Sequence, residues 1–253
     1  MAAEKNRQMT KIASARNPRL KALRRLGTTR GRELSGRFFA EGEDLIGAAR
    51  AAGREALEGY RLAGTDIGGA RFEDVEEGAL GSVSTLGSGT RAIGVYEQRW
   101  LEGAVGPVCV YLHGVADPGN VGTVVRGAAA FGAACVALGP GCADPHSPKA
   151  VRASMGAIFG MGLARVRTVD ELPRPRVALV AHAGQALATV WERLGRTGEV
   201  SLLVGAEREG LPEDVVEECE VVAHIPIAGE SLNAAMAATV GLYEVMQTTR
   251  VRA

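Results

Sequence analysis

Three loops rich in glycine and polar residues carry the side chains best suited to chemistry in this chain. They occupy residues 117–133, 202–212 and 224–245, and each follows an apolar run. Each loop places Asn, Arg, Glu or Ser beside glycines, which allow the backbone to approach a ligand closely. Open α/β sheets bind ligands beyond the carboxyl ends of their strands, which is where these loops are predicted to lie. We therefore expect the functional residues in these three segments.

Common catalytic and cofactor signatures are absent elsewhere. No Lys follows a glycine at Walker A spacing, and no G-x-S-x-G sequence marks a serine nucleophile. Gly87-Ser88-Gly89 with Ala92 completes a G-x-G-x-x-A pattern, but no clear helix follows it, which argues against a dinucleotide site. The cysteines and histidines are scattered without metal-ligand spacing, so we predict buried free thiols and no structural metal. These residues are Cys109, Cys135, Cys142 and Cys219, and His113, His146, His182 and His224.

The elements that must position the three loops form an α/β pattern. Continuous apolar runs are typical of parallel strands covered on both faces. Such runs occupy residues 108–115, 135–139, 163–166, 177–182, 200–205 and 221–227. Helices are predicted between them at 121–131, 148–159, 187–193, after Pro212, and at 231–247.

The first 96 residues read as a smaller α/β domain. A helix is predicted after Asn17-Pro18, with Leu20, Leu23 and Leu26 on one face. Strands are predicted at 37–40 and 92–96, and a helix at 43–52 ended by Gly53. The segment 97–107 contains glycines and Pro107 and is interpreted as a linker to a second domain at 108–253.

Composition indicates an ordinary globular protein with an unusual distribution of charge. The chain has 253 residues, of which 46% are hydrophobic and 23% charged, which excludes disorder and collagen-like repeats. Its net charge is zero, but residues 1–37 hold 11 Lys or Arg and two acids, so this segment carries +9 and the remainder −9. Such asymmetry suggests a polyanionic partner, and deletion of 1–37 should then abolish most of the salt dependence of binding. The alternative is genomic bias, since 25 of the 29 basic residues are Arg.

The sequence shows neither a secretion signal nor a membrane span. The N-terminus has no apolar stretch of the signal-peptide type, and no window approaches 18 consecutive apolar residues. We therefore expect a cytoplasmic protein that does not contact the membrane.

The three loops resemble, in order, the signature motifs of the SpoU (TrmH-like) family of RNA 2′-O-ribose methyltransferases in the SPOUT superfamily. The first motif is matched by Asp117-Pro118-Gly119-Asn120-Val121-Gly122 with Arg126, the second by Leu203-Val204-Gly205-Ala206-Glu207 with Gly210-Leu211, and the third by Ile225-Pro226 with Ser231-Leu232-Asn233. Residues 151–160 are similar to the family's connecting region, and 17–46 to its appended RNA substrate-binding domain. The connection 227–230 is shorter than in many members.

The resemblance implies a fold and a cofactor. The second domain would be a parallel α/β sheet whose C-terminal part forms a deep trefoil knot, with S-adenosylmethionine bound there largely through backbone groups. The cofactor positions it implies are Ala181, Gly205, Ile225 and Leu232. An adenine ring fits a flat apolar slot with few polar partners, and these residues supply one. Ile225 and Leu232 could equally be ordinary core.

The resemblance also implies a catalytic group. It assigns Arg126 to activation of the ribose 2′-hydroxyl, and a guanidinium, which stays protonated, suits stabilisation of a developing alkoxide. Asn120, Glu207, Ser231 and Asn233 would surround it. Each has a simpler interpretation: Asn120, Ser231 and Asn233 could be helix caps, and Glu207 a surface acid. On the predicted helix, Val124, Val125, Ala128 and Ala129 would form the buried face.

The function implied is S-adenosylmethionine-dependent 2′-O-methylation of RNA by a homodimer, without a metal. The last helix is apolar almost all round, which is compatible with a dimer interface that completes the site. The appended domain favours rRNA, including an antibiotic-resistance type acting on the large subunit. Two alternatives stay open: a tRNA ribose methyltransferase, and a non-catalytic RNA-binding protein that retains the fold.

Overall fold

A computed structural model of the chain describes residues 11–67, 72–86, 89–194 and 199–250, and side chains as far as residue 246. The chain divides into two compact units. Unit 1 comprises the chain up to Gln98 together with His146–Pro148, and unit 2 comprises Arg99–Pro145 and the chain from Lys149 onward. The G-x-G-x-x-A pattern at 87–92 lies partly outside the described residues.

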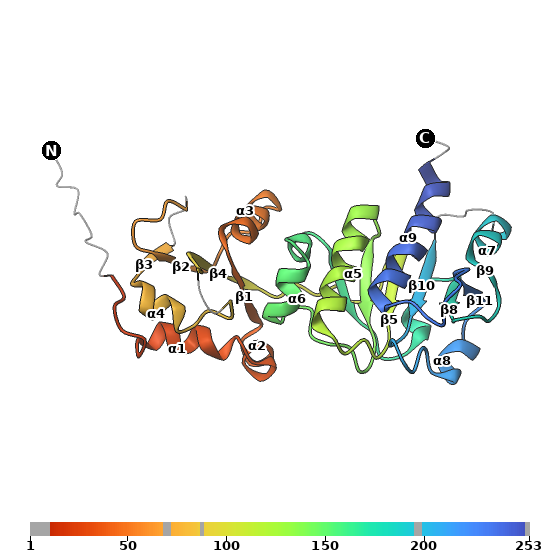
Figure 1. The fold of residues 1–253 in the computed structure, drawn as a ribbon, viewed down its shortest axis with the longest axis horizontal. Helices are drawn as coiled ribbons and strands as arrows, with labels where there is room; N and C mark the ends of the chain where they lie inside the picture. Colours follow the sequence, from red (N-terminus) through yellow and green to blue (C-terminus); the bar gives the residue numbers. More distant parts are fainter. Residues whose placement is uncertain (1–10, 68–71, 87–88, 195–198, 251–253) are drawn as a thin grey trace. The chain divides into compact units, whose positions relative to one another are not determined.

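Unit 1 is a four-stranded sheet with helices packed on it (Figure 1). The strands lie in the order β1 (Arg37–Glu41), β4 (Ala92–Glu97), β2 (Glu58–Leu62) and β3 (Phe72–Val75). The helices are α1 (Pro18–Arg25), α2 (Thr29–Ser35), α3 (Glu43–Ala51) and α4 (Glu77–Gly81). The side chain of Asn17 accepts a hydrogen bond from the N–H of Arg19, and Leu20 and Leu23 are buried, as the spacing predicted. The core of this unit also takes in Ile12.

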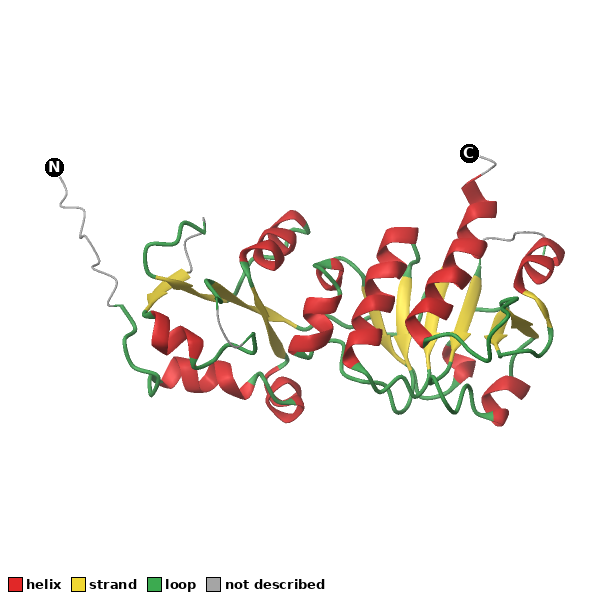
Figure 2. Ribbon diagram, in the orientation of Figure 1, coloured by secondary structure: helices red, strands yellow, loops and turns green. Residues whose placement is uncertain are grey.

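Unit 2 is a seven-stranded parallel sheet with helices on it (Figure 2). The strands lie in the order β7 (Gly162–Arg165), β6 (Cys135–Leu138), β5 (Val108–Leu112), β10 (Val200–Val204), β8 (Arg176–Leu179), β11 (Val221–His224) and β9 (Gln185–Ala186). The helices are α5 (Pro118–Phe131), α6 (Pro148–Ala153), α7 (Leu187–Arg193), α8 (Glu213–Glu217) and α9 (Ala234–Arg250), with short 3-10 turns η1 (Ala157–Phe159) and η2 (Val169–Glu171). The predicted parallel α/β sheet is confirmed.

Each face of the unit 2 sheet has its own cover. Helices α5 and α9 lie side by side over one face, where Gly241 of α9 sits against the side chain of Leu202 in β10 (Figure 1). On the other face, Tyr111 and Leu203 pack with Val215 of α8 and with residues of η2. Because both faces are buried, the central strands β5 and β6 are buried and apolar throughout rather than alternating.

Three predicted helix boundaries are wrong, each for a local reason. The helix expected at 121–131 begins one turn earlier, because Asp117 caps it and Pro118 occupies its first position. The helix expected at 148–159 ends at Ala153, since Met155 and Gly156 adopt positive φ angles of 49° and 91°. The helix expected from 231 begins at Ala234.

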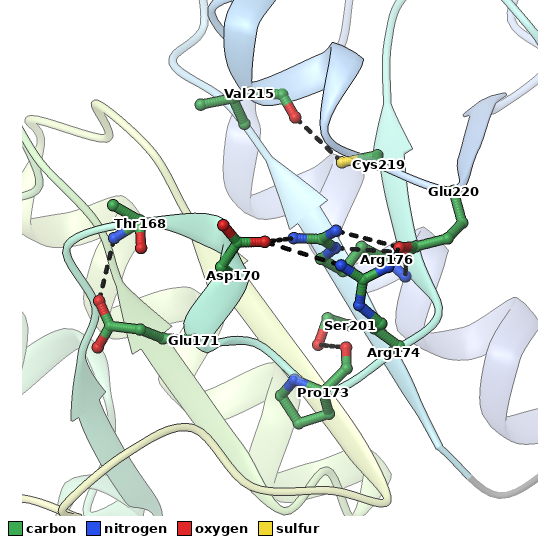
Figure 3. A network of polar contacts seen from close by, with 10 residues as sticks. All are labelled: Thr168, Asp170, Glu171, Pro173, Arg174, Arg176, Ser201, Val215, Cys219 and Glu220. Carbon is green, nitrogen blue, oxygen red and sulfur yellow. Dashed lines mark hydrogen bonds and ion pairs between the residues drawn. The ribbon is translucent and has the colours of Figure 1, made fainter.

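An ion-paired arginine joins three segments at the amino-terminal edge of the sheet (Figure 3). Arg176, at the start of β8, is only 2% exposed. Its guanidinium donates to Glu220, just before β11, at 3.0 and 3.3 Å, and to Asp170 of η2 at 3.0 Å. Its backbone N–H also donates to Glu220, at 2.7 Å. Two strands and a turn are thereby held together by one buried cation.

All four cysteines are free thiols, two buried and two partly buried. The thiol of Cys135 donates to the sulfur of Cys109 on the adjacent strand, at 3.2 Å. Within the described part of the chain, no cluster of three or more His, Cys, Asp or Glu could hold a metal ion. No described helix is both long and apolar enough to cross a membrane.

Candidate functional site

A pocket of about 370 Å³ lies at the carboxyl ends of β8, β10 and β11. We refer to it as the strand-end pocket. Ala181, Gly205, Ile225 and Leu232, the four predicted cofactor positions, all line it. The apolar runs predicted as strands continue past the true strand ends, which are Leu179, Val204 and His224. The residues beyond those ends are therefore free to form the pocket wall.

Gly205 allows the chain to fold back on itself at this pocket. A Cβ atom at this position would overlap the backbone of Gly210 and Leu211. The loop between them is closed by a hydrogen bond from the N–H of Gly210 to the carbonyl of Ala206, at 2.9 Å, and Gly210 has a φ of 70°. No side chain larger than hydrogen fits position 205 without moving this loop.

Asn120 connects the first loop to the other two. Its side-chain amide donates to the Glu207 carboxylate, and its carbonyl oxygen accepts from the Asn233 amide at 3.2 Å. The cap of α5 is instead Asp117, whose carboxylate accepts from the N–H of Asn120 at 3.0 Å. The interpretation of Asn120 as a helix cap is therefore wrong, and its side chain is available to join the loops.

Asn233 both caps α9 and bonds to Asn120. Its Oδ1 accepts from the N–H groups of Ala235 and Met236, at 2.9 and 3.3 Å, which caps α9. Its Nδ2 is then directed to Asn120. Since an amide oxygen that accepts two N–H groups leaves only the nitrogen as a donor, the orientation of both Asn side chains follows from their partners.

A lysine supports the cap of α5. Lys149 Nζ lies 2.5 Å from Asp117 Oδ2. This hydrogen bond, together with the backbone N–H groups of the first turn, holds the pKa of Asp117 below its usual value. The carboxylate thus stays ionised at the helix N-terminus, where negative charge is favourable.

Arg126 lies apart from the pocket. It is exposed on α5, and it is not among the residues lining the strand-end pocket. No hydrogen bond or ion pair joins it to Asn120, Glu207 or Asn233 among the described contacts. Val124, Val125 and Ala128 form the buried face of α5 as predicted, but Ala129 is exposed.

Glu207 and Ser231 both border the strand-end pocket. Glu207 is partly buried and bonded to Asn120, so it is not a simple surface acid. Ser231 is exposed and lies before the start of α9. The structure thus joins Asn120 to both Glu207 and Asn233 by hydrogen bonds, and of the four predicted polar residues only Glu207 and Ser231 line the strand-end pocket.

Several pocket residues were not predicted from the sequence. Arg208, Glu209 and Glu230 line the pocket and give it a charged rim. His182, with a positive φ of 58°, places its Nε2 2.9 Å from the Glu230 carbonyl, so the turn after β8 is tied to the loop 227–230. In the sequence, these residues are marked only by their place in the same loops as the motif residues. That place does not show which way their side chains point.

A shallow hollow with apolar walls lies between α5 and α9. It has a volume of about 400 Å³ and includes Asn120, Thr123 and Asn233. Beside it, α9 exposes large apolar side chains: Met236 is 57% exposed, Val240 40% and Tyr243 50%. The last helix, predicted to be apolar almost all round, therefore keeps part of its apolar surface exposed within a single chain. Apolar side chains grouped in this way often mark an interface.

The chain is similar in sequence and in structure to known proteins of one family. The family described as SpoU rRNA Methylase matches residues 107–243. The 23S rRNA (guanosine(2553)-2′-O)-methyltransferase RlmP of Bacillus subtilis is 29% identical over 94% of this chain and 99% of its own length. An uncharacterised tRNA/rRNA methyltransferase of Synechocystis is 30% identical, with 92% of each chain covered. The crystal structure of an AdoMet-bound rRNA methyltransferase from Sinorhizobium meliloti is 30% identical, with a TM-score of 0.81 over 94% of this chain and 97% of that chain.

Proposed function

Because the chain belongs to the SpoU rRNA methylase family, we propose that it transfers a methyl group from S-adenosylmethionine to a ribose 2′-hydroxyl of rRNA. The observation that carries this proposal is the strand-end pocket, which is lined by residues of the second and third sequence motifs and is joined to the first motif by the hydrogen bond from Asn120 to Glu207. Similarity to a relative that acts on a guanosine ribose of 23S rRNA supports the substrate class.

The residues of the strand-end pocket fit the cofactor. Leu179, Ile225 and Leu232 offer an apolar slot for an adenine ring, and Gly205 exposes backbone beside it. Glu207, Glu209 and Glu230 place carboxylates where a cationic sulfonium and ammonium would be favoured. When bound, S-adenosylmethionine supplies an electrophilic methyl group. The protein residues then have to orient the ribose hydroxyl and exclude water.

The catalytic roles follow from charge and hydrogen bonding. Arg126 would stabilise the negative charge that develops on the 2′-oxygen, because its guanidinium stays protonated. Asn120 and Asn233 would fix Glu207 and, with Ser231, position the ribose. The assembled Asn120–Glu207–Asn233 contacts favour an enzyme over a non-catalytic RNA-binding protein.

We further propose a homodimer in which α5 and α9 of two protomers pack together. The exposed Met236, Val240 and Tyr243 supply an apolar surface for this contact. Arg126 lies on the exposed side of α5 and outside its own chain's pocket, so it would serve the pocket of the partner subunit. Membership of the family also implies the trefoil knot in the C-terminal part of unit 2, an RNA-binding role for residues 1–96, and a cytoplasmic location with the ribosome.

Methyl transfer to unmodified transcripts tests the function directly. The protein should methylate a large-subunit rRNA transcript at one ribose, mapped by resistance of that linkage to alkaline cleavage. Methylation of tRNA transcripts alone would favour the alternative of a tRNA enzyme. Absence of S-adenosylmethionine binding by calorimetry, with or without RNA, would refute the proposal.

Substitution of Arg126 tests the catalytic role. Arg126→Ala should lower kcat by about 100- to 1,000-fold, the usual cost of losing one group that stabilises an oxyanion. Cofactor affinity should stay unchanged because Arg126 is proposed to act on the ribose 2′-oxygen and does not line the pocket of its own chain. Arg193→Ala, which removes an exposed arginine from α7, is the control and should keep full activity.

The same variant tests the dimer. If the site is completed across the interface, Arg126→Ala protomers mixed with Glu207→Ala protomers should recover activity that neither homodimer has. Mixed dimers without activity would show that Arg126 acts within its own chain.

A further inference from the structure

The cationic side chains at the start of unit 1 fall into two groups. Most are engaged by protein groups: Lys11 with Glu76 at 3.3 Å, Arg19 with Glu73, Arg24 with the Ala15 carbonyl, Arg32 with the Leu26 carbonyl at 2.8 Å, and Arg37 with Glu58 at 3.1 Å. Among the described contacts, no side-chain partner is found for Arg16, Lys21, Arg25 or Arg30, all of which are exposed. The positive charge of this segment is therefore only partly neutralised by the fold.

Three of these free cations, Lys21, Arg25 and Arg30, lie on the adjacent helices α1 and α2, whereas Arg16 precedes α1. Lys21 and Arg25 lie one turn apart on α1, opposite the buried Leu20 and Leu23. A Cβ at Gly31 would overlap the Arg25 carbonyl, so the first turn of α2 lies directly against the end of α1. Arg30 precedes that contact and extends the same region. We call Lys21, Arg25 and Arg30 the α1–α2 cationic surface.

The protein does little to offset this charge. Like charges four residues apart on a helix destabilise it slightly, and Glu33 is the single acid between residues 18 and 35. Elsewhere in unit 1, Arg61 pairs with Asp74 at 2.8 Å and Arg91 with Glu43 at 3.3 Å. An anionic partner would therefore form ion pairs with this surface without first breaking ion pairs within the protein.

We propose that the α1–α2 cationic surface binds phosphates of the RNA substrate. This inference rests on the proposed function, which supplies a polyanion as partner. It assigns phosphate binding to the three free cations of α1 and α2 and not to the whole positive segment, since Arg19, Arg24, Arg32 and Arg37 are occupied with protein groups. Phosphate contacts of this kind release counterions and make affinity depend on salt.

Deletion of residues 1–37 would not test this surface. That segment contributes Ile12, Leu20, Leu23 and Leu26 to the core of unit 1. There they lie in one cluster with Phe39 of β1, which the deletion would leave in place. Its removal would expose the core, so a loss of RNA binding would report unfolding. Point substitutions of exposed residues avoid this problem.

Two triple variants with equal changes in net charge form the test. One carries Lys21→Gln, Arg25→Gln and Arg30→Gln, and the matched control carries Arg19→Gln, Arg37→Gln and Arg61→Gln, which are ion-paired in unit 1. Binding of an unmodified large-subunit rRNA transcript is measured across a range of salt concentrations. Thermal unfolding confirms that both variants are folded.

The first variant should lower the slope of log affinity against log salt by about 2 to 3, which corresponds to three phosphate contacts. The control should change the slope little, and both should bind S-adenosylmethionine as the unmodified protein does. Equal slopes in the two variants would overturn the proposal, even if the unmodified protein methylates RNA. A protein that methylates no RNA would instead refute the proposed function.

Discussion

At the scale of single residues, Asn120 determines how the three motifs meet. Its amide has a donor side and an acceptor side, and each is used by a different loop. An aspartate would keep the shape but remove the donor, and it would place a second carboxylate beside Glu207. Two adjacent carboxylates cannot both ionise without cost, so one of them retains a proton to higher pH.

Asn120→Asp should therefore lower kcat/KM by about 100-fold near pH 7, the order expected for a displaced positioning residue. Its activity should recover partly as the pH falls toward about 5, because a shared proton restores the lost hydrogen bond. The pH profile of methyl transfer is the measurement. Gln185→Glu, which changes an exposed amide of β9 to a carboxylate outside both the strand-end pocket and the α5–α9 hollow, should show neither effect. A variant profile parallel to that of the unmodified protein would contradict this role.

Residue types could be predicted from the motifs, but their partners could not. Asn120 was open to two interpretations until Asp117 was seen to cap α5. Asn233 caps α9 with its amide oxygen and donates to Asn120 with its amide nitrogen, so its two amide atoms face different partners. The sequence gives the chemical group at each position. Which groups form hydrogen bonds depends on how the fold brings Asn120 to residues 87 and 113 positions later in the chain. The catalytic role of Arg126 stays a prediction.

At the scale of elements, long apolar segments were predictable and short mixed ones were not. β5, β6 and β10 are continuous apolar runs and were found near their predicted positions. β2 has the sequence EGYRL and β3 FEDV, whose polar residues gave no strand signal. The end of α6 depends on a positive φ at Met155, a conformation that methionine rarely adopts.

The ion-paired Arg176 gives a prediction about the sheet. Burial alone would raise the pKa of Glu220, but hydrogen bonds from the Arg176 side chain and backbone outweigh it, and the net pKa lies below its ordinary value. A lowered pKa means that ionised Glu220 stabilises the fold above its unfolded pKa. This stabilisation is lost as the pH falls through the folded pKa.

Glu220→Gln should destabilise the protein by about 1–2 kcal/mol at neutral pH, less than for a fully buried pair because Glu220 is partly exposed. Urea unfolding measures this difference, which should shrink below about pH 4. Glu217→Gln on α8 is the control, since this acid is exposed and has no described ion pair. A difference that does not depend on pH would show that Glu220 acts only through packing.

At the scale of the whole molecule, the excess of positive charge and the strand-end pocket belong to different structural units. The +9 segment belongs to unit 1, and the strand-end pocket to unit 2. Composition and the change in apolar pattern near residue 97 were sufficient to predict two units. The order of strands in the sheet was not predictable, because it depends on crossovers that local sequence does not encode.

The two units should respond differently to the cofactor. Both tryptophans, Trp100 and Trp191, belong to unit 2, so their fluorescence reports its unfolding alone. S-adenosylmethionine at 100 times its Kd should stabilise that transition by about 2.7 kcal/mol. Circular dichroism, which also reports unit 1, should then show a second transition that the cofactor does not move. Complete coincidence of the two probes with cofactor present would indicate a single cooperative unit.

The hydrogen bonds of Asn120 have a consequence for biosynthesis. One partner lies 87 residues later in the chain and the other 113 residues later. During translation, Asn120 emerges from the ribosome long before either partner exists. Ile225 and Leu232 of the strand-end pocket also follow the last of the seven strands of unit 2, so the nascent chain cannot complete the pocket until all of these strands have been made. Since contacts so distant in sequence also form slowly, the site should be among the last parts of the molecule to mature.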